Sequence, residues 1–171
     1  MKLGFLGLAV IFLAGCSQQQ NTNANSANAA LESKVASLQQ QVNDSRPGLG
    51  EIMGVIEQHH AKLYYAGTKA NWPLAAYELN EIQESLEDAM SLYPTPFKNV
   101  TTALPAIIPA MTKGTIAGVQ QAIAQKNEKS FLVAYEALSK SCSSCHAAEN
   151  HPFIKIQTPA PGMFSDQDFA P

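Results

Sequence analysis

Two cysteines and a histidine within five residues place the strongest constraint on this chain. Cys142, Cys145 and His146 have the spacing Cys-x-x-Cys-His. Residues three and four positions apart share one face of a helix, about a turn apart. The two thiols and the imidazole are therefore placed for two thioether bonds to the vinyl groups of a haem, with His146 directed at the iron. The motif predicts one covalent haem c, and an exposed dithiol or disulfide is the alternative.

The segment that precedes these cysteines has the periodicity of a helix that faces a core. Apolar residues recur at helical spacing from residue 128 onward, at Phe131, at Ala134 or Tyr135, and at Leu138. The same stripe continues into the two cysteines. We therefore expect the thiols to face the protein interior, where a group as large and flat as a porphyrin would fill the space.

Three further segments have helical periodicity, and no segment has a convincing strand pattern. The four expected helices cover residues 49–66, 71–93, 110–125 and 128–148. Pro105 and Pro109 place the start of the third helix at residue 110. Four helices with short connections predict an all-α protein, an antiparallel up-down-up-down four-helix bundle over residues 48–150. In that topology the haem motif, near the C-terminal end of the fourth helix, lies beside the first half of the first helix.

The N-terminal residues indicate export. A positive start at Lys2 precedes an apolar run of eleven residues that ends at Leu13. This run is too short to span a bilayer and is typical of a signal peptide. It ends in the residues Leu-Ala-Gly-Cys, with the cysteine at position 16, which resembles the lipobox of bacterial lipoproteins. An ordinary secretory signal with a coincidental cysteine is the alternative.

The lipobox resemblance implies that residues 1–15 are removed and that Cys16 becomes the lipidated N-terminus. Ser17 follows the cysteine in place of an aspartate, which favours the outer membrane over the inner one. We therefore expect a lipid-anchored protein in the bacterial periplasm. Export agrees with the haem motif, because bacteria attach c-type haem outside the cytoplasm.

The regions on either side of the bundle have different compositions. Residues 16–30 contain no large apolar side chain and predict a flexible tether. Leu31, Val35, Leu38 and Val42 then recur at spacings of four, three and four, which predicts a short helical or coiled-coil segment over residues 31–45. A homodimer contact and a simple helical spacer are both open. Residues 151–171 are proline-rich and without a period, as expected of a tail that wraps the surface or is loose.

An exported bundle with Cys-x-x-Cys-His near its C-terminus resembles the cytochrome c′ and cytochrome c-556 family, over roughly residues 48–148. In that family a residue early in the first helix faces the open side of the iron. It is bulky and apolar in five-coordinate members and a methionine in the electron carriers. Met53 falls at this position, and the segment Met53-Gly54-Val55-Ile56 is similar to the family's Met-x-x-Ile segment. The resemblance implies His146 as the proximal ligand and Met53 as the distal one.

Two other arrangements of the distal side remain open. His59 and His60 are adjacent and point about 100° apart, so only one of them can face the core. His60 follows Met53 by seven residues, which is about 10 Å along the helix, and is the alternative ligand. Both histidines can instead form a polar, partly exposed pair on the flank of the helix. The remaining alternative is an open coordination site.

The overall charge and the motif together predict the class of function. A net charge of −3 argues against nucleic-acid binding. We expect a membrane-tethered, mono-haem c-type cytochrome that is not an enzyme and that exchanges single electrons with redox partner proteins of the cell envelope. The alternatives are a haem-based binder or sensor of NO or CO, a thiol–disulfide protein, and a weak peroxidase. The last ranks lowest because no distal arginine–histidine pair is evident.

Overall fold

The computed structural model describes residues 16–160 and 167–171. The chain divides into two compact units, Met1–Arg46 and Pro47–Pro171. The predicted signal peptide over residues 1–15 lies outside the described residues. No described helix is both long enough and apolar enough to cross a membrane.

The N-terminal unit contains one described helix, α1 (Cys16–Ser45). This helix covers residues 31–45, where the heptad spacing predicts it, and also residues 16–30, where we expected a flexible tether. The extension has a physical reason, because residues 16–30 contain no proline or glycine and several alanines and glutamines, which are good helix formers. The side chains of residues 24–45 are all exposed, so no core packing within this unit stabilises the helix.

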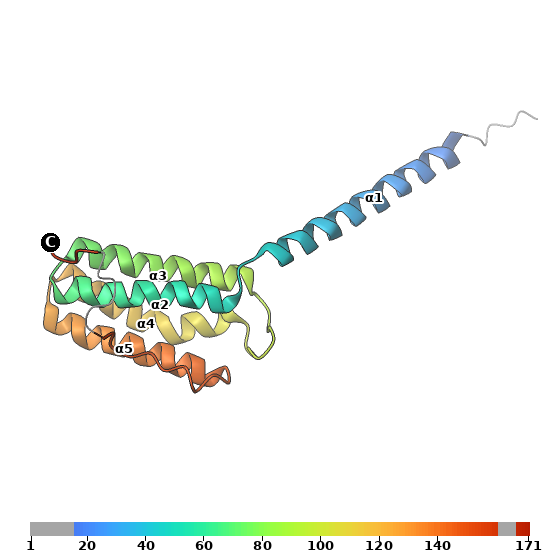
Figure 1. Ribbon diagram of the computed structural model, residues 1–171. Coiled ribbons are helices and arrows are strands. Elements are labelled where there is room, and N and C mark those ends of the chain that lie inside the picture. The colour runs from blue at the N-terminus through green and yellow to red at the C-terminus, as the bar shows by residue number, and fades with distance from the viewer. Residues whose placement is uncertain (1–15, 161–166) are drawn as a thin grey trace, which may run out of the picture. The chain divides into compact units, whose positions relative to one another are not determined.

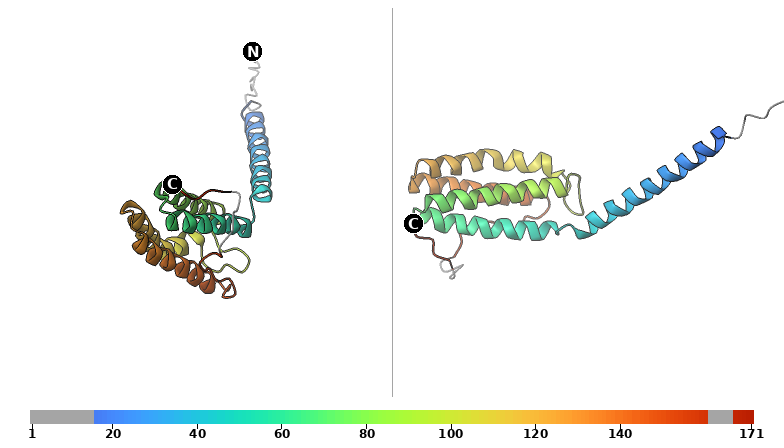
Figure 2. Two further views of the ribbon diagram at one scale, coloured as in Figure 1. Left: turned by 60° about the vertical axis from the view of Figure 1, so that its left-hand side comes forward. Right: turned by 90° about the horizontal axis from the view of Figure 1, so that it is seen from above.

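The larger unit is a helical bundle, which confirms the all-α prediction for the described residues. Its helices are α2 (Leu49–Thr68), α3 (Trp72–Leu92), α4 (Leu104–Ala124) and α5 (Glu128–Ala148). α2 packs against α3 and α5, and α4 also packs against α3 and α5. Each helix therefore has two neighbours, and the views in Figures 1 and 2 show the four lying side by side.

The core lies between the four helices and receives one apolar stripe from each. The stripe predicted for the last helix is confirmed, since Phe131, Tyr135 and Leu138 are almost completely buried. Each such side chain contributes about 1.5–3 kcal/mol by its removal from water. Val55 is 44% exposed, whereas Ile52 and Ile56 of the same helix are buried in the core.

The start of α4 differs from the prediction, because the helix begins at Leu104 and not at residue 110. Pro105 lies in the first turn, where a missing N–H costs nothing. Pro109 lies inside the helix and removes one backbone hydrogen bond. The burial of Ile107 and Ile108, each less than a tenth exposed, stabilises this turn in spite of the proline.

At Gly67, α2 and α5 approach each other closely. A Cβ atom added at Gly67 would lie 2.1 Å from Cε1 of Phe131, which is fully buried. Only a glycine allows the Phe131 ring to lie against the backbone of α2.

We predict that Gly67→Ala lowers the free energy of unfolding by about 1–3 kcal/mol, because the ring or the helix must shift. Gly114→Ala is the matched control, since a Cβ there meets nothing within 4 Å. The control should raise the free energy of unfolding by about 0.5–1 kcal/mol through helix propensity. Urea denaturation followed by circular dichroism measures both, and equal effects of the two substitutions would contradict the packing described.

Candidate functional site

A single cavity of the bundle brings together the residues that the sequence singles out for haem binding. Met53 from α2 and Cys142, Cys145 and His146 from α5 all line it. The other lining residues are mostly apolar and come from all four helices and the C-terminal tail: Ile56, Glu57, His60, Ile82, Leu86, Ile108, Thr112, Leu138 and Ile156. The stripe of α5 directs both thiols toward this space, as predicted.

The two thiols are free and partly exposed. Burial, together with the neighbouring Cys145, raises the pKa of the Cys142 thiol to about 11. Burial and the charge of Glu149 also raise the pKa of Cys145. Both thiols are therefore protonated at neutral pH. Thiols of disulfide oxidoreductases have lowered pKa values, so this environment is opposite to the one that thiol–disulfide exchange requires.

His146 is partly buried next to the thiols. Burial lowers the pKa of its imidazole, the main chain of Ile154 opposes this effect, and His151 adds to it. A neutral imidazole is the form that binds a metal. Its Nδ1 atom is buried and makes no hydrogen bond of normal length and angle within the described part of the chain.

His60 is buried, so the interpretation of both histidines as a partly exposed pair is wrong. Its side chain is 6% exposed, and its ring stacks on Tyr135 with 4.4 Å between the centroids. Nε2 lies 2.9 Å from Oγ of Ser139, and Nδ1 lies 2.8 Å from the hydroxyl of Tyr135. Both ring nitrogens of His60 therefore have hydrogen-bond partners on α5.

The hydrogen bonds around His60 also indicate its protonation state. The Ser139 hydroxyl donates to the carbonyl of Tyr135 at 3.0 Å, so Oγ is an acceptor for Nε2–H. The Tyr135 hydroxyl has two acceptors within reach, the carbonyl of His60 at 3.0 Å and Nδ1 of the neutral ring at 2.8 Å. Burial lowers the pKa of His60 to about 4, which agrees with a neutral ring. Iron binding by His60 would require the loss of at least one of these buried hydrogen bonds.

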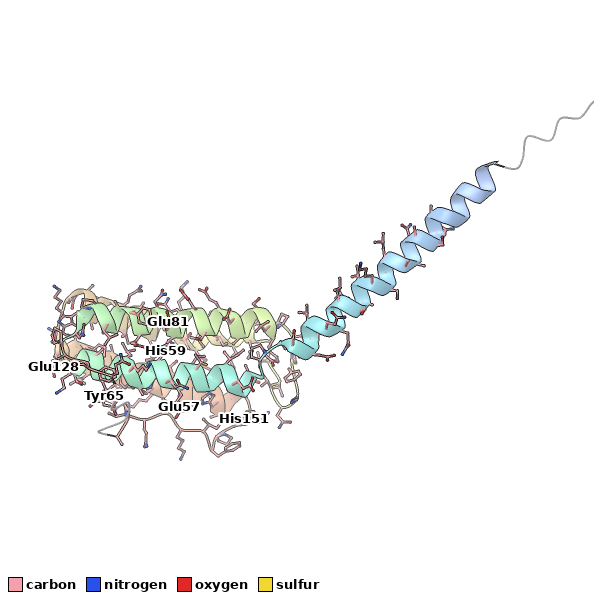
Figure 3. All side chains as sticks on the ribbon, turned by 45° about the horizontal axis from the view of Figure 1, so that its top comes forward. Glu57, His59, Tyr65, Glu81, Glu128 and His151 are labelled. Atoms are coloured by element: carbon pink, nitrogen blue, oxygen red, sulfur yellow. The ribbon has the colours of Figure 1, made fainter. Side chains whose placement is uncertain are left out.

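His59 points toward α3 and contacts the carboxyl group of a buried glutamate. Its Nδ1 lies 2.7 Å from Oε2 of Glu78, which is only 2% exposed, and its Nε2 lies 3.9 Å from Oε2 of Glu81. Figure 3 shows His59 and Glu81 on the facing sides of the two helices, with Glu57 on the other side of α2. The sequence analysis missed this pair, although Glu78 interrupts the apolar stripe of α3 between Ala75 and Ile82.

The residues around the cavity fit a haem c. The walls are apolar, as a porphyrin requires, and two neutral thiols and a histidine lie at one side with a methionine from the facing helix. No group of three or more histidine, cysteine, aspartate or glutamate side chains in the described residues is arranged to hold a metal ion by itself. The available donors, a histidine and a thioether, are those that hold haem iron in electron-carrying cytochromes.

The C-terminal tail takes part in the site, which sequence reasoning did not predict. The N–H of Ile156 donates to Oγ of Ser143 at 2.9 Å, and the side chain of Ile156 lines the cavity. Farther along, the Tyr65 hydroxyl donates to the carbonyl of Ala160, and Nδ2 of Asn71 donates to the carbonyl of Ala170 at 2.9 Å. The described parts of the tail therefore lie against the bundle and are not loose.

Glu149 ties the end of α5 to the connection between α3 and α4. Its Oε2 accepts hydrogen bonds from the N–H groups of Thr101 and Thr102 at 2.6 and 3.0 Å, and from the Thr101 hydroxyl at 3.2 Å. Burial raises the pKa of Glu149, but these hydrogen bonds outweigh it and the net pKa is lowered. The carboxylate thus fixes the residues that directly follow the haem motif.

We predict that Glu149→Gln lowers the free energy of unfolding at pH 7 by about 2 kcal/mol, because charge-assisted hydrogen bonds are lost. The folded-state pKa lies below the ordinary value of 4.5. The stabilisation by the carboxylate is therefore complete above that value and disappears as the pH falls through the folded-state pKa. Urea denaturation of both proteins from pH 7 down to pH 3 measures this. A difference that stays constant over this range would contradict the assignment.

Comparison with known proteins identified no relative of this chain. No family model matches the chain, and neither a curated protein nor a solved structure matches it. The assignment of a function therefore depends on the chemistry of the cavity.

Proposed function

We propose that this chain is an exported, membrane-tethered, mono-haem c-type cytochrome that carries single electrons in the cell envelope. The observation that carries the proposal is the shared cavity, which is lined by Met53, Cys142, Cys145 and His146. When bound, haem c supplies a one-electron couple between ferric and ferrous iron.

Each of these residues has a separate role. Cys142 and Cys145 hold the group through thioether bonds, and His146 is the proximal ligand. Met53, on the facing helix, is the distal ligand, and a thioether ligand raises the reduction potential. The apolar walls from α3 and α4 exclude water from the site.

The bundle has an antiparallel, up-down-up-down topology in this proposal. Two contacts between α2 and α5, and the cavity that they share, support it. Gly67, near the end of α2, lies against Phe131, near the start of α5. His60, in the middle of α2, hydrogen-bonds Ser139. Met53, near the start of α2, shares the cavity with His146 near the end of α5. Two helices that meet in this order run in opposite directions.

The proposal also includes the attachment of the N-terminal region to the membrane. Cys16, lipidated after the removal of residues 1–15, anchors the protein on the periplasmic side of the outer membrane, as the lipobox resemblance implies. An anchored carrier meets membrane-bound redox partner proteins at a high effective concentration. The exposed stripe of Leu31, Val35, Leu38 and Val42 on α1 is consistent with a homodimer contact or with a spacer.

Two observations favour this function over the alternatives. The raised pKa of Cys142 is unsuited to thiol–disulfide exchange. His60 has both nitrogens in hydrogen bonds, which favours Met53 over His60 as the distal ligand. A filled sixth site is the arrangement of an electron carrier and not of a gas binder.

We predict that the full chain, produced together with a cytochrome c maturation system, carries one covalent haem. The pyridine haemochrome spectrum of the acid-extracted protein measures it. The control is the double variant Cys142→Ser with Cys145→Ser, which should carry none. The absence of covalent haem from the parent protein would refute the proposal.

We predict that Met53 is the distal ligand and that the parent protein is low-spin in both oxidation states. Met53→Ala should become high-spin and bind carbon monoxide, as absorption spectra would show. His60→Gln is the matched control on the same helix, and it should stay low-spin because an amide can replace part of the hydrogen bonding. A low-spin Met53→Ala protein would eliminate Met53, and a high-spin parent that binds carbon monoxide would favour the gas-binding alternative.

A further inference from the structure

The C-terminal tail turns back along α5 directly after the haem motif. Asn150 has a positive φ of 65°, and the N–H of His151 donates to the carbonyl of His146 at 2.8 Å. A left-handed residue followed by this hydrogen bond is a Schellman cap, which reverses the chain at a helix end. In Figure 1 the orange-red chain after α5 runs back beside that helix. The reversal brings residues 151–156 close to the motif.

A serine inside the motif anchors this segment. Ser143 lies between the two cysteines, and its Oγ accepts the N–H of Ile156 at 2.9 Å. The same oxygen lies 3.3 Å from the carbonyl of Ile156. The Ile156 side chain lines the cavity together with His146. Both the backbone and the side chain of Ile156 are therefore tied to the haem-binding residues.

The anchored segment also passes the imidazole of His146. Nδ1 of this ring is buried and makes no hydrogen bond of normal geometry among the described residues. Ile154 uses its N–H in a bond to the carbonyl of His151 at 3.0 Å, so its carbonyl is the main-chain group of this residue that is left to accept a hydrogen bond. A histidine that binds a metal through one nitrogen normally donates from the other to a carbonyl or a carboxylate.

We propose that the tail is a strap that positions the proximal histidine, with Ser143 holding Ile156 so that the Ile154 carbonyl accepts a hydrogen bond from Nδ1–H of His146. This leaves Nε2 as the nitrogen for the iron. The inference rests on the proposed function, because the strap acts at a ligand only where haem is bound. A hydrogen bond of this kind makes the imidazole a stronger electron donor, which lowers the reduction potential.

The test compares two neighbouring serines of the motif in the haem-loaded full chain. Ser143→Ala removes the anchor, whereas Ser144→Ala is the matched control, since Ser144 is exposed and its hydroxyl donates to the carbonyl of Lys140 at 2.8 Å. Trypsin cleavage after Lys155, which is exposed, reports the release of the tail. We expect cleavage about tenfold faster in Ser143→Ala and unchanged in Ser144→Ala. We also expect an upward shift of the reduction potential in Ser143→Ala alone.

Ser143→Ala alters the motif to which the haem is attached. A second variant therefore tests the strap with the motif unchanged. Ile156→Pro leaves the motif intact and removes the N–H that Ser143 accepts. It should give the same upward shift of the reduction potential, which is the measurement for this variant because trypsin does not cut a lysine–proline bond. Equal potentials in Ser144→Ala, Ile156→Pro and the parent, all with haem attached, would overturn the strap and leave the proposed function intact. Absence of haem from the parent would refute the proposed function, and the strap with it.

Discussion

The packing of α5 against α2 is the contact on which the rest of the site depends. Phe131 lies against Gly67, where any side chain would collide with the ring. Two turns farther along, Ser139 meets His60. These contacts fix both the distance between the helices and their register. One turn beyond Ser139, the same face of α5 carries Cys142, which therefore reaches the cavity opposite Met53.

Buried polar groups make this register specific. A purely apolar interface between two helices tolerates small slips, whereas an unpaired buried polar group costs about 1–3 kcal/mol. A shift of α5 along α2 would break the hydrogen bonds of His60 with Tyr135 and Ser139 together. The interaction of His59 with the buried Glu78 has the same effect between α2 and α3. The bundle is thereby held in the one arrangement that brings the four predicted haem-binding residues to a single cavity.

Local patterns were sufficient to predict much of this arrangement. The apolar stripe of α5 and the spacing of the motif placed Cys142, Cys145 and His146 on an inward face, and the short connections predicted a bundle. The family resemblance placed Met53 at the start of the first helix, and this residue does line the cavity. The features of α5 depend on helical periodicity, which is readable from residues that are close in sequence, whereas the role of Met53 is what the resemblance implies.

Other features depend on contacts between residues that are far apart in the sequence, and a periodicity does not reveal them. His60 pairs with residues 75 and 79 positions away, so its burial could not be derived from α2 alone. The anchoring of the tail by Ser143 and the role of Glu149 depend on a few hydrogen bonds between loops and the last turns of α5. The early start of α4 reflects the burial of Ile107 and Ile108, which overrides the unfavourable Pro109. The helix over residues 16–30 shows that a low apolar content does not by itself exclude helix formation.

The most direct test of the central claim is mass spectrometry of the tryptic peptide that extends from Ser141 to Lys155. This peptide contains both motif cysteines and His146. After expression with a cytochrome c maturation system, the account predicts a mass increase of one haem on this peptide, with both thiols consumed. An unmodified peptide, or one in which the two cysteines form a disulfide, would contradict it.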